Sequence, residues 1–151
     1  MQAFDSVDAV LDFAIEREEE AFGFYSEMGT RVDRPHMKEL FEQFAQEEKG
    51  HKAKLQRVKQ GKLLLPAQNE VLDLKMGDYL VTDETAEQIS YQEALILAMK
   101  KEKVAFKLYT DLAAAVSSAD LKNTFLSLAQ EEAKHKLRFE VEYDNEIMGE
   151  N

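Results

Sequence analysis

The sequence contains one pattern of glutamate and histidine twice, at a constant spacing. The segment Ala45-Gln46-Glu47-Glu48-x-x-His51-Lys52 recurs 84 positions later as Ala129-Gln130-Glu131-Glu132-x-x-His135-Lys136. The same spacing relates an earlier set to its copy: Ala14, Glu18, Ala21, Phe22 and Tyr25 match Ala98, Glu102, Ala105, Phe106 and Tyr109. Both halves therefore keep one internal geometry. The repeat predicts a helical hairpin that is present twice, with the two copies related by a pseudo-two-fold axis.

Apolar residues recur at helical spacing in four segments, at about 6–30, 35–61, 90–116 and from 117 or 118 into the glutamate-rich tail. Pro35 suits a first helical turn, and Ser90 with Glu93 forms a capping box. The inward face of the third helix is predicted to include Leu95, Ala98, Ala105, Phe106 and Tyr109. Few residues join the first two segments or the last two, so each pair should form an antiparallel hairpin.

The connection between the second and third helices, at about 61–88, is too long for a simple turn. It can run back along a helix of ~38 Å and pack on it through Leu63, Leu64, Leu65, Val71, Leu72, Leu74, Met76 and Leu80. The predicted fold is all-α: a ferritin-like antiparallel four-helix bundle with a long crossover between helices 2 and 3. Residues 1–151 are predicted to form a single domain, with hairpin repeats at about 5–60 and 89–147.

Four glutamates and two histidines occupy inward positions near the middle of the four helices. They are Glu18, Glu48, His51, Glu102, Glu132 and His135. Buried carboxylates are costly without a counter-charge, and no Lys or Arg lies on these faces. Two divalent ions would supply that charge, and mixed carboxylate and imidazole ligands suit iron, manganese or zinc. The alternative, a plain bundle with buried polar pairs, explains two matching motifs poorly.

Other polar residues near these motifs are assigned less directly. Tyr25 and Tyr109 each lie seven residues after an inward glutamate. Each is therefore either a core residue or has a role at the site, by hydrogen-bonding to a ligand glutamate or by quenching radicals. Glu47 and Glu131 lie one residue outside the ligand frame, where they contact the ligands or are exposed. His36 is predicted to be a surface residue.

These residues resemble the rubrerythrin branch of the ferritin-like superfamily, through E-x-x-A-x-x-x-Y on the first and third helices and E-E-x-x-H on the other two. The resemblance implies a non-haem di-iron centre with two iron ions per chain, held by the six residues above. Rubrerythrins proper also carry a Cys-ligated rubredoxin-like domain, and a further Glu where this chain has Ala105. The expected centre is therefore the symmetric six-ligand version.

The resemblance favours a redox enzyme, a rubrerythrin-like peroxidase that acts in oxidative-stress defence. The centre would reduce hydrogen peroxide or dioxygen, and an external electron donor such as a rubredoxin-type protein would re-reduce it. A ferroxidase or iron-storage protein is the alternative. A hydroxylase and a purely structural metal site also remain open.

Composition excludes several other functions. The chain has no Cys, which excludes disulfides, cysteine nucleophiles and Cys-ligated clusters. The formal net charge of -11 argues against nucleic-acid and membrane partners. The N-terminus has neither a basic segment nor a long apolar run, so a cytoplasmic protein is expected. Pairing of two bundles into a homodimer is also expected.

Overall fold

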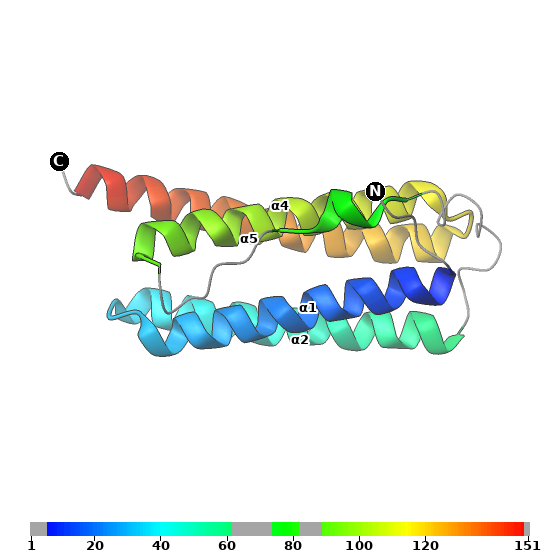
Figure 1. Cartoon of the computed structure of the whole chain (residues 1–151), viewed down its shortest axis with the longest axis horizontal. Coiled ribbons are helices and arrows are strands. Elements are labelled where there is room, and N and C mark those ends of the chain that lie inside the picture. Colours follow the sequence, from blue (N-terminus) through cyan, green and yellow to red (C-terminus); the bar gives the residue numbers. More distant parts are fainter. Residues whose placement is uncertain (1–5, 62–73, 82–88, 150–151) are drawn as a thin grey trace.

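The computed structural model of the protein describes residues 6–61, 74–81 and 89–149. In these ranges the chain is helical, as predicted. The elements are α1 (Val7–Arg31), α2 (Pro35–Gly61), the 3-10 helix η2 (Met76–Tyr79), α4 (Tyr91–Ala115) and α5 (Ala119–Gly149). Figure 1 shows the four long helices lying along one axis as two hairpins, α1 with α2 and α4 with α5. The four-helix bundle is therefore confirmed.

The helix ends follow the local sequence. The Ser6 hydroxyl accepts a hydrogen bond from the Ala9 amide at 3.0 Å and caps α1. Ser90 and Glu93 form both bonds of the predicted capping box at the start of α4. Pro35 is the first residue of α2, where its missing amide hydrogen costs no helical hydrogen bond.

The duplication extends to the turns within each hairpin. Lys38 donates to the Gly29 carbonyl at 2.6 Å, and its equivalent Lys122 donates to the Ala113 carbonyl at 2.7 Å. Both lysines reach carbonyls in the last turn of the preceding helix, which lack helical partners. The repeated sequence thus produces a repeated structure.

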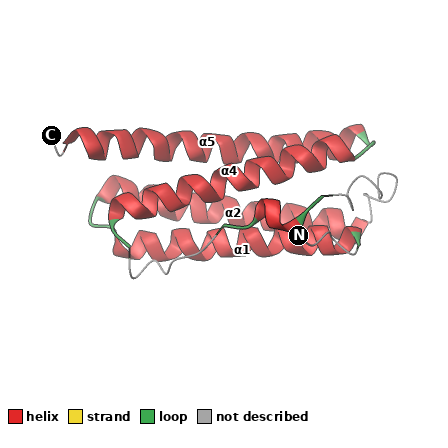
Figure 2. Ribbon diagram, turned by 45° about the horizontal axis from the view of Figure 1, so that its top comes forward, coloured by secondary structure: helices red, strands yellow, loops and turns green. Residues whose placement is uncertain are grey.

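The buried apolar side chains form two clusters. One includes Leu11, Leu55, Leu112, Leu121 and Phe125. The other includes Phe24, Met37, Phe41, Leu95 and Phe139. Figure 2 shows the helices running side by side along the length of the bundle. The two clusters flank the layer at mid-bundle that holds the predicted ligand residues, so apolar packing on either side fixes the positions of the polar side chains between them.

Two apolar side chains, one in the crossover and one on α4, lie differently from the prediction. Leu80 is 50% exposed and Phe106 on α4 is 40% exposed, although both were expected to face inward. Tyr79 is buried instead, and its hydroxyl donates to Asp111 of α4 at 2.8 Å. Leu74 packs against the first cluster as predicted. Residues 62–73, with Leu63, Leu64, Leu65, Val71 and Leu72, and the Met76 side chain lie outside what the structure describes.

Candidate metal centre

The six predicted ligand residues meet in one buried layer. Glu18 comes from α1, Glu48 and His51 from α2, Glu102 from α4, and Glu132 and His135 from α5; each is between 1% and 4% exposed. Within α2 and α5, the spacing of three residues places the glutamate and the histidine one turn apart on the same face.

The six residues form two overlapping groups that could each hold an ion. One group is Glu18, Glu48, His51 and Glu132, and the other is Glu48, Glu102, Glu132 and His135. Within each group the ligand atoms lie within 4.8 Å of one another. Glu48 and Glu132 belong to both groups, so each is placed to bridge two ions.

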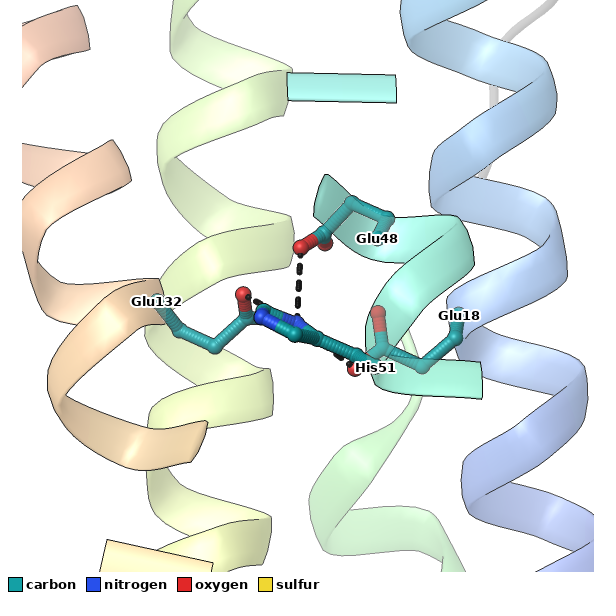
Figure 3. A group of neighbouring side chains, drawn as sticks. All are labelled: Glu18, Glu48, His51 and Glu132. Atoms are coloured by element: carbon teal, nitrogen blue, oxygen red, sulfur yellow. Dashed lines mark ion pairs between the residues drawn. The ribbon is translucent and has the colours of Figure 1, made fainter. Parts of the chain in front are cut away.

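The first group surrounds Nδ1 of His51, as Figure 3 shows. This nitrogen lies 3.1 Å from Glu48 Oε1, 3.3 Å from Glu132 Oε1 and 3.4 Å from Glu18 Oε2. In the second group, His135 Nδ1 lies 3.5 Å from Glu102 Oε2 and 3.6 Å from both Glu48 Oε1 and Glu132 Oε1. The two histidines thus present the same nitrogen to equivalent carboxylates, as the pseudo-two-fold axis requires.

Each of the six residues has one buried polar atom without a hydrogen-bond partner in the described structure. The atoms are Oε1 of Glu18, Glu48 and Glu132, Oε2 of Glu102, and Nδ1 of both histidines. A buried polar atom left unsatisfied costs about 1–3 kcal/mol, so six in one layer would be a heavy burden in a protein without a bound ion. Metal ions are the partners that suit this set of oxygen and nitrogen donors. The residues present therefore fit a pair of metal ions.

The outer nitrogen of each histidine is held by a carboxylate of the opposite hairpin. His51 Nε2 lies 2.8 Å from Glu131 Oε2, and His135 Nε2 lies 3.3 Å from Glu47 Oε1. An ionised carboxylate only accepts hydrogen bonds, so it holds the proton on Nε2 and leaves the Nδ1 lone pair for a metal. Glu47 and Glu131 thus contact the predicted ligands, one of the two alternatives that the sequence left open.

The two tyrosines also reach across between the hairpins. The Tyr25 hydroxyl of α1 donates to Glu102 of α4, and the Tyr109 hydroxyl of α4 donates to Glu18 of α1. Both tyrosines are buried. The sequence left a core role and a site role open, and the structure shows that both rings pack in the core while both hydroxyls bind predicted ligands.

Burial and crowding of like charges control the ionisation of the layer. Burial first, and then the charges of Glu132, Glu102 and Glu18, raise the pKa of Glu48 well above its ordinary value of 4.5. Burial likewise raises the pKa of Glu132, where the charge of Glu102 adds to it. Burial also raises the pKa of Glu102, although its contacts with His135 and Tyr25 oppose the shift. These three carboxyls therefore take up protons more readily than an exposed glutamate does.

The pKa values of the two histidines are also raised, because the nearby carboxylates outweigh the effect of burial. Burial alone would lower the pKa of His51, but the close contacts of its Nδ1 with the carboxylates of Glu18 and Glu48 raise it to about 11. The pKa of His135 is also raised, through Glu102 and Glu47, against the effect of burial. The layer therefore attracts positive charge, which metal ions supply when they displace the protons.

A cavity of about 40 Å³ opens onto the carboxylates. Its walls come mainly from α1 and α4, where Ala21 and Ala105 are among the lining residues, and Tyr79 and Val81 of the crossover contribute to them. This volume exceeds what one water molecule needs, and it suits a molecule of a few atoms. The role of the crossover residues was missed because the crossover has no helical periodicity to place them.

Two further titratable residues, His36 and Glu142, lie outside the metal layer. His36 is on the surface, as predicted, and its Nε2 lies 3.3 Å from Glu142 Oε1. Glu142, in the glutamate-rich tail, is 5% exposed and also accepts a hydrogen bond from Tyr91 at 2.7 Å. This contact joins α4 and α5 away from the metal layer.

Comparison with known proteins identifies the family of this chain. The family model for rubrerythrin matches residues 9–143. The chain belongs to the rubrerythrin family. No curated protein sequence matches it. In the described ranges of this rubrerythrin-family chain, no helix is long and apolar enough to cross a membrane.

Two solved structures share the fold. A Thermotoga maritima protein, described as a candidate ferritin-like diiron-carboxylate protein, is 22% identical with a TM-score of 0.81. The match covers 97% of this chain and 99% of that one. A Pyrococcus furiosus protein described as hypothetical is 23% identical with a TM-score of 0.69, over 90% of this chain and 87% of that one. The ferritin-like fold predicted from the sequence is therefore confirmed.

Proposed function

We propose that the chain is a non-haem di-iron protein that reduces hydrogen peroxide, or dioxygen, with electrons from an external donor. The observation that carries this proposal is the set of six buried, unpartnered donor atoms arranged as two groups around Glu48 and Glu132. Two divalent ions would balance four carboxylates. The description of the Thermotoga maritima protein as diiron-carboxylate favours iron over manganese or zinc.

A pair of ferrous ions, when bound, supplies the two electrons that reduce an O–O bond. The side chains of this protein would hold that pair and control access to it. The Tyr25 and Tyr109 hydroxyls fix the orientation of Glu102 and Glu18. Burial first, and then nearby carboxylates, raise the pKa of both tyrosines well above 10.0, so each hydroxyl keeps its proton.

The cavity limits the substrate by size. About 40 Å³ admits hydrogen peroxide or dioxygen but excludes bulky organic substrates. Hydrogen peroxide takes up two electrons and two protons and gives two water molecules. We expect the oxidised centre to regain two electrons from an external donor, because the sequence contains no cysteine to hold a Cys-ligated iron that could supply them.

Anaerobic titration tests the proposal. Metal-free protein is loaded with two Fe(II) per chain, hydrogen peroxide is added, and the absorbance and the protein-bound iron after gel filtration are followed. One peroxide per two Fe(II), with the iron retained, is the expected result. Release of Fe(III), or accumulation of iron beyond two per chain when excess Fe(II) is supplied, would instead indicate a ferroxidase or iron-storage protein. Glu132→Gln should impair the reaction, whereas Glu142→Gln, another buried glutamate of α5, should not.

A further inference from the structure

Helices α1 and α4 carry opposite charges at equivalent outer positions, although their inward ligand positions match. At the positions equivalent to Glu16, Glu19 and Gly23 of α1, helix α4 has Lys100, Lys103 and Lys107. The three lysines are spaced so that they share one face of the helix. The equivalent glutamates of α1 are exposed. This difference in charge lies on the outer faces of α1 and α4, whereas the predicted ligands lie on their inner faces.

The lysines line a groove of about 630 Å³ between α4 and the crossover, together with Leu80, Val81 and Phe106. We call it the lysine groove. Leu80 and Phe106 are two of the large apolar side chains that the protein exposes. Lys107 pairs with Asp111 at 2.8 Å but keeps 52% of its side chain exposed. Lys100 and Lys103 are exposed and have no ion-pair partner among residues 6–61, 74–81 and 89–149.

The lysine groove adjoins the candidate metal centre. Val81 and Val104 line both the groove and the cavity that opens onto the carboxylates. Lys103 directly follows Glu102 in α4. A partner in the groove would therefore lie across one helix from the metal layer, and an α-helix with its side chains is about 10 Å wide.

We propose that the lysine groove docks the electron donor, an acidic protein that carries its redox group at its surface. This inference rests on the proposed function, which requires an external source of electrons. Exposed lysines in a chain of net charge -11 attract an acidic partner to this face. Transient electron-transfer contacts bury little surface, so two apolar side chains beside three lysines suffice for such a contact.

A second copy of this chain is the competing occupant, because the acidic face of α1 also complements the lysines. Such a contact would join unlike faces and would leave a free face at each end of the pair. It would bring no electrons to the metal layer. The donor is therefore favoured, and self-association is an outcome that the experiment can detect.

The test measures how fast the oxidised, iron-loaded protein is reduced, by stopped-flow absorbance at low ionic strength. The probe is a reduced rubredoxin of negative net charge, which is a small one-electron carrier. Lys100→Glu/Lys103→Glu should slow the second-order reaction about tenfold or more, and the difference should shrink in high salt. The control is Lys49→Glu/Lys134→Glu, which changes the net charge equally at two exposed lysines of α2 and α5 that also adjoin predicted ligands.

A reduced, uncharged phenazine separates failure of this inference from failure of the proposed function. If the phenazine reduces every variant equally and only the groove variant is slow with rubredoxin, the docking site is supported. Equal slowing by the groove and control variants would overturn it. A groove variant that alters only the sedimentation behaviour would assign the groove to self-association. If the phenazine cannot reduce the iron-loaded protein at all, the proposed redox function fails instead.

Discussion

Replacing Tyr25 by Phe should destabilise the metal-free protein by about 1.5–3 kcal/mol, in the upper part of the range for a buried polar atom that loses its hydrogen-bond partner. The Tyr25 ring packs against Phe41 and Phe139, and Phe keeps those contacts. The substitution removes only the hydroxyl that donates to Glu102 Oε1. Because Glu102 Oε2 already lacks a hydrogen-bond partner in the described structure, both oxygens of this buried carboxyl would then be unsatisfied.

Urea denaturation of the chelated protein, followed by circular dichroism, gives the free energy of unfolding. The melting temperature should fall by roughly 3–12 °C, since 1 kcal/mol is worth about 2–4 °C in a chain of this size. Tyr109→Phe should cost a similar amount, because its hydroxyl binds Glu18 in the equivalent way. Tyr143→Phe is the matched control. That tyrosine is partly buried, and no hydrogen bond from its hydroxyl is found within the described ranges.

Two results would refute this reasoning. If Tyr25→Phe costs no more than Tyr143→Phe, the hydroxyl does not stabilise Glu102. If Tyr25→Phe and Tyr109→Phe differ by much more than ~0.5 kcal/mol, the usual scatter between independent sites, then the two halves of the polar layer are not equivalent.

Three further predictions concern the metal, pH and assembly. Elemental analysis should find two metal ions per chain; Glu48→Ala should lose both ions, whereas Glu18→Ala should weaken one. Burial raises the pKa values of Glu48, Glu102 and Glu132, so the folded apo protein binds more protons than the unfolded chain. The stability of the apo protein should fall as pH rises above 4.5, the ordinary pKa of glutamate, so its melting temperature should be lower at pH 8 than at pH 5. The metal-loaded protein should show the opposite trend, because protons compete with the metal for its ligands. Light scattering should show a homodimer at high micromolar concentration, and a monomer there would contradict the expected pairing of bundles.

Much of the fold could be predicted because helical periodicity is a local property. The spacing of three residues between Glu48 and His51 fixes them on one face whatever surrounds the helix. The repeat at 84 residues then requires that Glu132 and His135 do the same. The predicted helix ends at Pro35 and Ser90 were correct for a similar reason, since capping depends on nearby residues.

Contacts between hairpins could not be predicted in this way. Tyr25 lies on the same helix as Glu18, yet its hydroxyl binds Glu102 on the other hairpin. Which carboxylate it reaches depends on how far one hairpin is shifted along the other, and helical spacing contains no information on that shift. The contact of Glu131 with His51 depends on the same shift.

The crossover and the end of α5 escaped prediction for a different reason. Tyr79 is buried by its fit against α4 and its bond to Asp111, while neighbouring Leu80 is exposed. Hydrophobicity alone would favour the reverse. Glu142 is buried because Tyr91 and His36, distant in the sequence, both approach it. A glutamate in an acidic tail gives no sign of such partners.

The residues that differ between the repeats are the ones that can make the two sides of the centre unequal. The donors themselves match, because each hairpin must supply the same ligands across a pseudo-two-fold axis. Phe44 stacks on the His135 ring with centroids 3.9 Å apart, but its equivalent in the other repeat is Leu128, so only one histidine has this aromatic support. The lysines of α4 similarly replace glutamates and a glycine of α1. Duplication therefore accounts for how two ions would be held, whereas under the proposed docking the positions that differ between the repeats would decide what approaches the ions and from which side.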